Sequence, residues 1–160
     1  MTQGINWRAV IWSAIIAGLV FLMLEMVLVA TVGGGSPWGP PRMIAAMVMG
    51  EGVLPPPATF EMAPMLVAML VHFTLSVVFA AILGWVISNR GLGLGMSLLV
   101  GTLFGLLIYF VSFYIFTSVW PWFAMARGMI SIFAHAAYGF TLGWAYHALA
   151  SRHVTVVEDR

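Results

Sequence analysis

The chain lacks cysteine and lysine altogether, and only 7% of its 160 residues are charged. Without cysteine it can form no disulfide, thiolate metal site or iron–sulfur cluster and has no thiol nucleophile, which excludes several classes of redox enzyme. A soluble domain carries about 25% charged residues, so water is not the main solvent of this chain. Six arginines and five acidic residues leave a net charge of +1, which gives no basic surface for nucleic acid.

Common catalytic motifs are missing as well. The sequence contains no Gly-x-Ser-x-Gly, no His-Glu-x-x-His and no phosphate-binding glycine loop. Hydrolases and nucleotide-driven enzymes usually carry one of these motifs, so the sequence favours a protein that is not an enzyme. The first apolar run has no small-residue cleavage site, and we expect it to remain as a membrane anchor.

Four long apolar stretches dominate the chain, 62% of which is hydrophobic. They cover roughly residues 9–32, 62–88, 92–118 and 122–149. A helix that crosses a membrane needs about 20 mostly apolar residues at a rise of about 1.5 Å each, and all four stretches meet that need. The sequence therefore predicts an all-α fold, a polytopic membrane four-helix bundle that makes residues 1–160 one transmembrane domain.

The arginines indicate how this bundle is oriented in the membrane. With four crossings they divide into a group of four on one side and a pair on the other: Arg8, Arg90, Arg152 and Arg160 against Arg42 and Arg127. Arginine is enriched on the cytoplasmic side of membrane proteins. We therefore expect both termini in the cytoplasm and the connection 33–61 outside.

That outer connection is predicted to contain a short helix that lies in the membrane interface. Pro40-Pro41 precede an apolar run that ends at Gly50, and proline at a helix start with glycine at its end bounds a helix at about 41–50. Arg42 then lies at the positive end of the helix dipole and Glu51 at its negative end, which is unfavourable for both. We expect partners elsewhere in the chain to hold these charges.

The chain also contains a weak internal repeat. The motif Ala14-x-x-x-Gly18 with Glu25 matches Gly101-x-x-x-Gly105 with Ser112 in the third stretch. His72 and His135 begin similar stripes of small residues in the second and fourth stretches, and a competing register differs by about one helical turn. The sequence therefore predicts two tandem helical hairpins related by an axis along the membrane normal.

Stripes of small residues let membrane helices approach closely. A bundle of four helices needs only some of these stripes for its own packing. The surplus indicates either more internal contacts or association with other membrane subunits or a second copy, in addition to the lipid bilayer.

Three ionisable residues lie deep within the apolar stretches, far from their ends: Glu25, His72 and His135. Such groups are costly in lipid and are functional candidates, with partners to be found. Counting residues from the outer ends puts them at depths of roughly 10, 15 and 20 Å, close enough to form one layer. In the simplest interpretation Glu25 pairs with a histidine, or each group bonds a backbone carbonyl, and the layer only locks the bundle.

Three functional interpretations of this layer stay open. His72 and His135 are candidate axial ligands of a haem b, with Arg127 facing a propionate. Alternatively, Glu25 and the two histidines bind a transition metal, for which imidazole and carboxylate are suitable ligands. In the third interpretation the chain is a small proton, ion or metal conductor that uses Glu25. The cofactor is therefore haem b, a transition metal or none.

Three runs carry a resemblance to a known family. They are Gly-Gly-Gly-Ser-Pro-Trp-Gly-Pro-Pro-Arg-Met-Ile-Ala-Ala at 33–46, Leu-Pro-Pro-Pro-Ala-Thr-Phe at 54–60 and Pro-Trp-Phe-Ala-Met-Ala-Arg at 121–127. In these runs the chain resembles an uncharacterised family of small four-helix inner-membrane proteins of proteobacteria. The resemblance extends over most of the chain and implies a bacterial inner membrane, but no functional residues. Some members carry the label sodium:proline symporter, although four spans are too few for the large repeats of broken helices that such transporters use.

Taken together, small size, missing enzyme motifs and surplus packing motifs predict a non-catalytic accessory subunit of a larger, energy-transducing membrane complex. The haem carrier and the conductor remain the alternatives.

Overall fold

The computed structural model describes residues 4–158, with side chains for residues 4–151. Arg160 thus lies outside the described residues, and only the backbone of Arg152 is described. The described chain is helical and has no strand. Its four long helices are α1 (Trp7–Thr31), α3 (Met62–Arg90), α4 (Leu94–Phe110) and α5 (Met129–Glu158). Short helices complete it: α2 (Gly39–Met49), η1 (Glu51–Val53), η2 (Val111–Ile115), η3 (Phe116–Ser118) and η4 (Pro121–Ala126).

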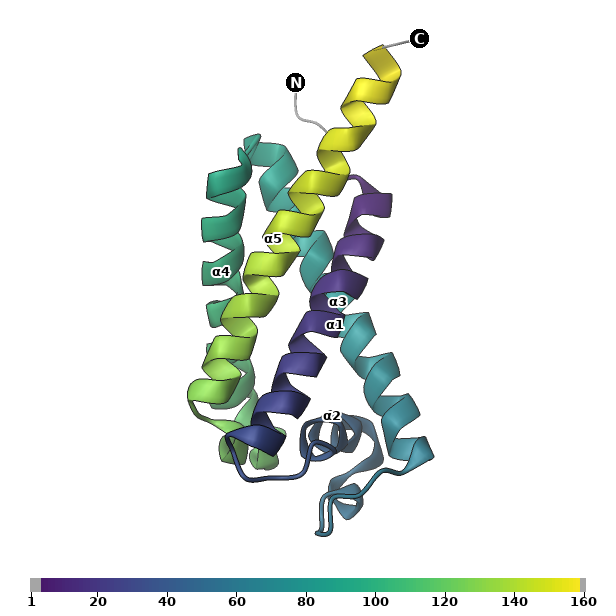
Figure 1. Ribbon diagram of the computed structural model, residues 1–160, viewed down its shortest axis with the longest axis vertical. Coiled ribbons are helices and arrows are strands. Elements are labelled where there is room, and N and C mark those ends of the chain that lie inside the picture. Colours follow the sequence, from purple (N-terminus) through teal and green to yellow (C-terminus); the bar gives the residue numbers. More distant parts are fainter. Residues whose placement is uncertain (1–3, 159–160) are drawn as a thin grey trace.

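The long helices lie alongside one another, and α2 lies across one end of them (Figure 1). We call the end that carries α2 and η4 the loop end. We call the opposite end, where α1 begins, α5 ends and α3 turns into α4, the terminal end. The α3–α4 turn is tight because Gly91 adopts a left-handed conformation with φ of 57°.

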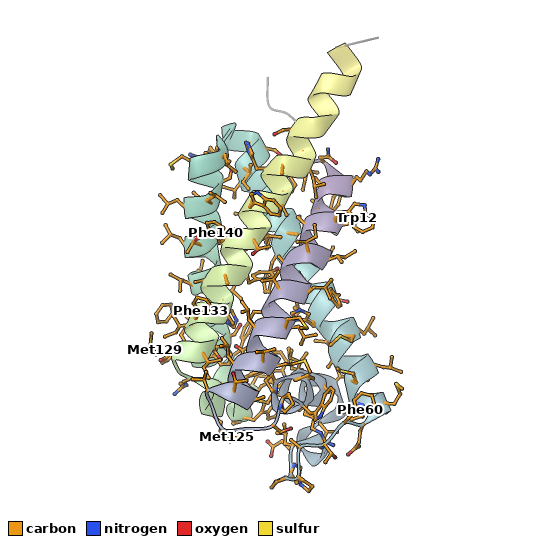
Figure 2. All side chains as sticks on the ribbon, viewed as in Figure 1. Trp12, Phe60, Met125, Met129, Phe133 and Phe140 are labelled. Carbon is orange, nitrogen blue, oxygen red and sulfur yellow. The ribbon has the colours of Figure 1, made fainter. Side chains whose placement is uncertain are left out.

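Three helical segments within the described residues are long and apolar enough to cross a membrane: Trp7–Thr31, Met62–Arg90 and Leu94–Ser118. Large apolar side chains cover the outward faces of the bundle; Trp12, Phe60, Met125, Met129, Phe133 and Phe140 are exposed examples labelled in Figure 2. Such a surface is stable in lipid but not in water. The chain therefore has the helices and the surface of a small integral membrane protein.

The fourth expected span, 122–149, differs from the structure at both ends. Residues 121–126 form the separate helix η4, which begins with Pro121, and Arg127 is extended with φ of −64° and ψ of 126°. Helix α5 begins only at Met129 and continues to Glu158. It is not among the three segments above, because histidine, tyrosine and glycine residues on its packed face lower its mean hydropathy.

Helix α5 packs against both α4 and α1, and α1 packs in turn against α3. The α4–α5 contact is made by glycine. A Cβ atom added at Gly101 or Gly105 would collide with the backbone of α5, and one added at Gly139 or Gly143 would collide with the backbone of α4. Glycines without side chains let two backbones touch, which is how helices gain packing energy in lipid.

Polar side chains tie α1 to α3 and both of them to α5. Ser76 Oγ donates to the Ala14 carbonyl at 2.8 Å, and its oxygen is 3.0 Å from the Tyr138 hydroxyl. Nearer the terminal end the Tyr146 hydroxyl is 2.7 Å from Ser88 Oγ, and Gly84 makes room for its ring. These bonds satisfy buried hydroxyl groups that lipid could not solvate.

Helices α3 and α4, although consecutive, touch very little. They diverge from the turn that joins them (Figure 1), and an edge contact between Phe79 and Phe104, with ring centroids 6.2 Å apart, is one of the places where they meet. The bundle is therefore closed at the terminal end and open between these two helices towards the loop end.

The glycine contact gives a direct stability prediction. Gly139→Ala would place a methyl group against the Gly101 carbonyl and, at 2.8 Å, the Gly105 amide nitrogen, so the helices must separate. We expect a loss of about 1–3 kcal/mol and a lower unfolding temperature in detergent. Gly95→Ala in the same hairpin is the control, because nothing lies within 4 Å of its added Cβ; equal stability of the two variants would contradict this packing.

Candidate functional site

A cavity of about 890 Å³ lies in the loop-end half of the bundle. Residues of α1, α3, α4 and α5 form its walls, and α2 and η4 lie across its loop end. Most of the lining side chains are apolar. Pockets that hold small molecules measure about 300–1,000 Å³ and have mainly apolar walls with a few polar groups. The cavity matches that description in both size and lining.

Two layers of polar groups face this cavity. In the first, the Phe21 ring stacks on His72 with centroids 5.5 Å apart and meets His135 edge-on at 4.7 Å. In the second, one turn nearer the loop end, Glu25 of α1 lies beside the Ser131 side chain of α5. All five side chains line the cavity. The three residues singled out by the sequence thus surround one space, in two adjoining layers.

Glu25 is a buried residue with an oxygen atom that lacks a hydrogen-bond partner. Its side chain is only 5% exposed, and its Oε1 atom has no hydrogen-bond partner among the described residues. Within residues 4–151 the ion pair that forms is Arg42–Glu61, so Glu25 has no basic partner there. Burying a carboxyl group without partners is costly, and such exceptions in folded proteins call for an explanation.

The two histidines, by contrast, are each held by a backbone carbonyl. His72 Nε2 donates to the Gly18 carbonyl at 2.9 Å, and His135 Nδ1 donates to the Ser131 carbonyl at 2.7 Å. Because a carbonyl only accepts, these bonds fix the tautomer of each neutral ring. The lone pair is left on His72 Nδ1 and on His135 Nε2. Backbone bonding is the simplest of the interpretations that the sequence allowed, and Glu25 pairs with neither ring.

The geometry limits how a haem could use these rings. Both imidazoles contact the same Phe21 ring, so a macrocycle between them requires Phe21 to move. His72 would also have to release Gly18 or bind iron through Nδ1. Bis-histidine haem binding stays a prediction, and the arrangement described does not accommodate it.

Arg127, the residue expected at a haem propionate, is engaged elsewhere. Its Nε donates to the Phe113 carbonyl at 2.7 Å, and its Nη2 donates to Thr117 Oγ1 at 3.2 Å. The guanidinium also lies over the Tyr114 ring, 4.5 Å from its centroid. A cation bonded to carbonyls at the end of a helix stabilises that end. Arg127 therefore holds the last turns after α4 at the rim of the cavity.

The proposed metal ligands do not form a ready site. In the part of the chain with described side chains, no group of three or more histidine, cysteine, aspartate or glutamate residues is placed to hold a metal ion. Glu25, His72 and His135 would have to move towards one another. Metal binding by these three residues stays a prediction.

Matching positions of the predicted repeat make matching contacts. Gly18 meets His72 and Ala14 meets Ser76 in the first hairpin; in the second, Gly105 meets His135 and Gly101 meets Gly139. If His72 is aligned with His135, the predicted repeat expects contacts between these pairs of positions. The repeat stays a prediction, and Glu25 and Ser112, its unlike positions, both line the cavity.

Arg42 has the partners that its unfavourable helix position required. This arginine is 7% exposed; its Nη1 donates to the Val53 carbonyl at 2.9 Å, its Nε to the Thr59 carbonyl at 3.0 Å, and it pairs with Glu61. It thereby holds the return segment against α2, whose Met43 lines the cavity. The Met43 carbonyl also accepts a bond from Trp122 Nε1 at 3.0 Å, which joins α2 to η4.

Sequence reasoning missed Phe21. An aromatic residue in an apolar stretch is unremarkable by composition, and its position one turn from both Gly18 and Glu25 is the one signal that points to it. No family model matches the chain, and neither a curated protein nor a solved structure shows significant similarity to it. The site therefore has to be interpreted from its own geometry.

The arginine anchor can be tested by local dynamics. Arg42→Gln removes the charge and most of the bonds to the return segment, and hydrogen bonds from a charged donor contribute about 1.5–3 kcal/mol each. We expect amide hydrogen exchange in residues 50–61 to become roughly ten- to a hundredfold faster. The control is Arg8→Gln at the exposed start of α1; the same exchange rates in both variants would show that Arg42 is no anchor.

Proposed function

We propose that the chain is a non-catalytic accessory protein of the membrane, whose own task is to bind a small lipophilic molecule within the bilayer. The observation that carries this proposal is the cavity of about 890 Å³ with an apolar lining and a buried carboxyl group whose Oε1 atom has no partner among the described residues. An apolar cavity with few polar groups is the usual form of a small-molecule site.

The proposal includes four crossings with both termini in the cytoplasm of a bacterial cell and the loop end outside. Helix α5 has 30 residues and so a length of about 45 Å, more than the hydrocarbon core of about 30 Å. It packs between α1 and α4, and Phe133, Phe140 and Trp144 are exposed along it as on a lipid-facing helix. The cavity would then lie in the outer half of the membrane.

The absence of cysteine makes this topology easy to test. Single cysteines at Gly52, Gly93 and Ser151, all exposed, mark the loop end, the α3–α4 turn and the end of α5. We expect a membrane-impermeant maleimide to label Gly52→Cys in intact cells, and Gly93→Cys and Ser151→Cys only after permeabilisation. If Ser151→Cys reacts from outside while Gly93→Cys does not, α5 does not cross.

A lipophilic ligand has a route into the cavity from lipid. The walls diverge between α3 and α4, and lining residues at the rim, Leu75, Phe116 and Met129, are exposed on the outer surface. A molecule dissolved in the bilayer can therefore reach the site without passing through water. This favours a lipophilic ligand over a solute from the aqueous phase.

The structure changes the support for the accessory role and for the conductor role. The glycines that indicated partner subunits are used inside the protein: those of α4 and α5 pack against each other, Gly18 packs against α3 and Gly84 against α5. The accessory role therefore now depends on the small size and the missing enzyme motifs. A conductor using Glu25 is favoured by the same carboxyl group. However, Leu83, Leu142 and Tyr146 are at most 1% exposed and fill the terminal half, so the cavity does not continue across the bundle.

Carbene labelling tests whether the cavity admits a lipophilic molecule. We expect a small apolar iodophenyl diazirine, photolysed with the protein in nanodiscs, to label the cavity residues Ile108 and Phe113, which are 8% and 6% exposed. Leu83 and Leu142, which are 1% and 0% exposed, are also buried but lie in the packed half, and they should stay unlabelled.

A variant pair completes the test. Ser112→Trp should fill part of the cavity and lower labelling of Ile108 and Phe113 at least about fivefold, whereas Leu103→Trp on the exposed face of α4 should not. Labelling confined to exposed residues in the unmodified protein would refute the proposed binding function.

A further inference from the structure

Glu25 places an acidic group in the cavity, and the arginine of the described lining is already bonded elsewhere. The carboxyl is 5% exposed, lines the cavity and leaves Oε1 without a partner among the described residues. The other charged residue in the lining is Arg127, which is exposed at the rim and bonded to Phe113 and Thr117. A ligand with a positive charge would supply what the chain does not supply to Glu25.

The walls of the same cavity are rich in aromatic rings. Six of the rings that line the cavity belong to Phe21, Phe79, Phe113, Phe116, Phe123 and Trp120. The face of an aromatic ring attracts a cation, and the attraction grows when the cation is removed from water. Aromatic cages are a known means by which proteins recognise quaternary ammonium groups. The rings and the carboxyl therefore favour the same kind of ligand, by two independent interactions.

The two histidines also favour a ligand that carries positive charge or hydrogen-bond donors. Their backbone bonds leave lone pairs on His72 Nδ1 and His135 Nε2, and both residues line the cavity. Several donors of the lining are already used: Ser36 bonds the Ala58 carbonyl, Ser76 the Ala14 carbonyl and Arg127 the Phe113 carbonyl. The polar part of the cavity thus offers acceptors to a ligand that brings positive charge or donors.

We propose that the cavity takes a lipophilic organic cation, whose charged head lies beside Glu25 and whose apolar body lies between the aromatic rings. This inference rests on the proposed binding function and adds the charge of the ligand to it. It also gives Glu25 a reason to be in the first hairpin where the second has Ser112: one carboxylate suffices for one cation. An anion of the same shape would be repelled by the carboxylate.

The experiment compares two probes of opposite charge and similar shape, tetraphenylphosphonium and tetraphenylborate. Binding of each to the protein in nanodiscs is measured by equilibrium dialysis, with empty nanodiscs subtracted. We expect saturable binding of the phosphonium and none of the borate. Glu25→Gln should weaken phosphonium binding at least about tenfold, because it removes the opposing charge in a desolvated site. Glu51→Gln, an exposed glutamate at the same end, is the matched control and should bind as the unmodified protein does.

The iodophenyl diazirine is applied to the same samples. Bound phosphonium should protect Ile108 and Phe113 from labelling. If the diazirine labels the cavity but the borate binds as well as the phosphonium, or Glu25→Gln binds the phosphonium unchanged, the cation inference is overturned and the binding function stands. If the diazirine does not reach the cavity either, both fail. The comparison of the two ions in the unmodified protein decides the question even if Glu25→Gln does not fold.

Discussion

Contact between the glycine faces of α4 and α5 is the constraint on which the rest of the bundle depends. Gly101 and Gly105 bring the α4 backbone against Gly139 of α5, closer than any side chain would allow. Helix α5 then has its opposite side free for α1, and α1 carries α3. Helices α3 and α4 make few contacts with each other. The cavity lies in the loop-end half of the bundle, and both helices contribute to its walls.

Buried polar groups in lipid must find partners inside the protein, and most of those in this bundle do. The recurrent solution is a side chain on one helix bonded to a main-chain carbonyl, as for His72 on Gly18 and Ser76 on Ala14. Such bonds leave the carbonyl's own helical bond in place, because a carbonyl has two lone pairs. Glu25 departs from this rule, and it does so where the helices separate. The unmet group and the empty volume therefore coincide, which is the strongest indication that the site has a ligand.

Contacts at the loop end cover the cavity on that side. Arg42, buried in α2, bonds the return segment, and Trp122 of η4 bonds the Met43 carbonyl of the same helix. These contacts join α2, the return segment that follows it and the distant η4 into a cover across the cavity. The loop end of the cavity is thus covered by segments joined through polar contacts, whereas the side chains between α3 and α4 include the apolar rings Phe79 and Phe104.

The sequence by itself determined the helical class and the three apolar spans, and it located the ionisable residues within apolar stretches, because length, hydropathy and the cost of charge in lipid are local properties. It also predicted that Arg42 needs partners. The start of the helix can be located from the sequence, and the helix dipole makes a positive charge unfavourable there. It did not place the start of α5, because residues 121–126 form the separate helix η4 and Arg127 is extended, although residues 122–126 are all apolar. Nor did it predict Phe21 between the histidines or the cavity itself. Those features depend on which helices touch and how closely, and that was decided by the tertiary structure, because an opening between helices is a property of their packing and not of any one segment.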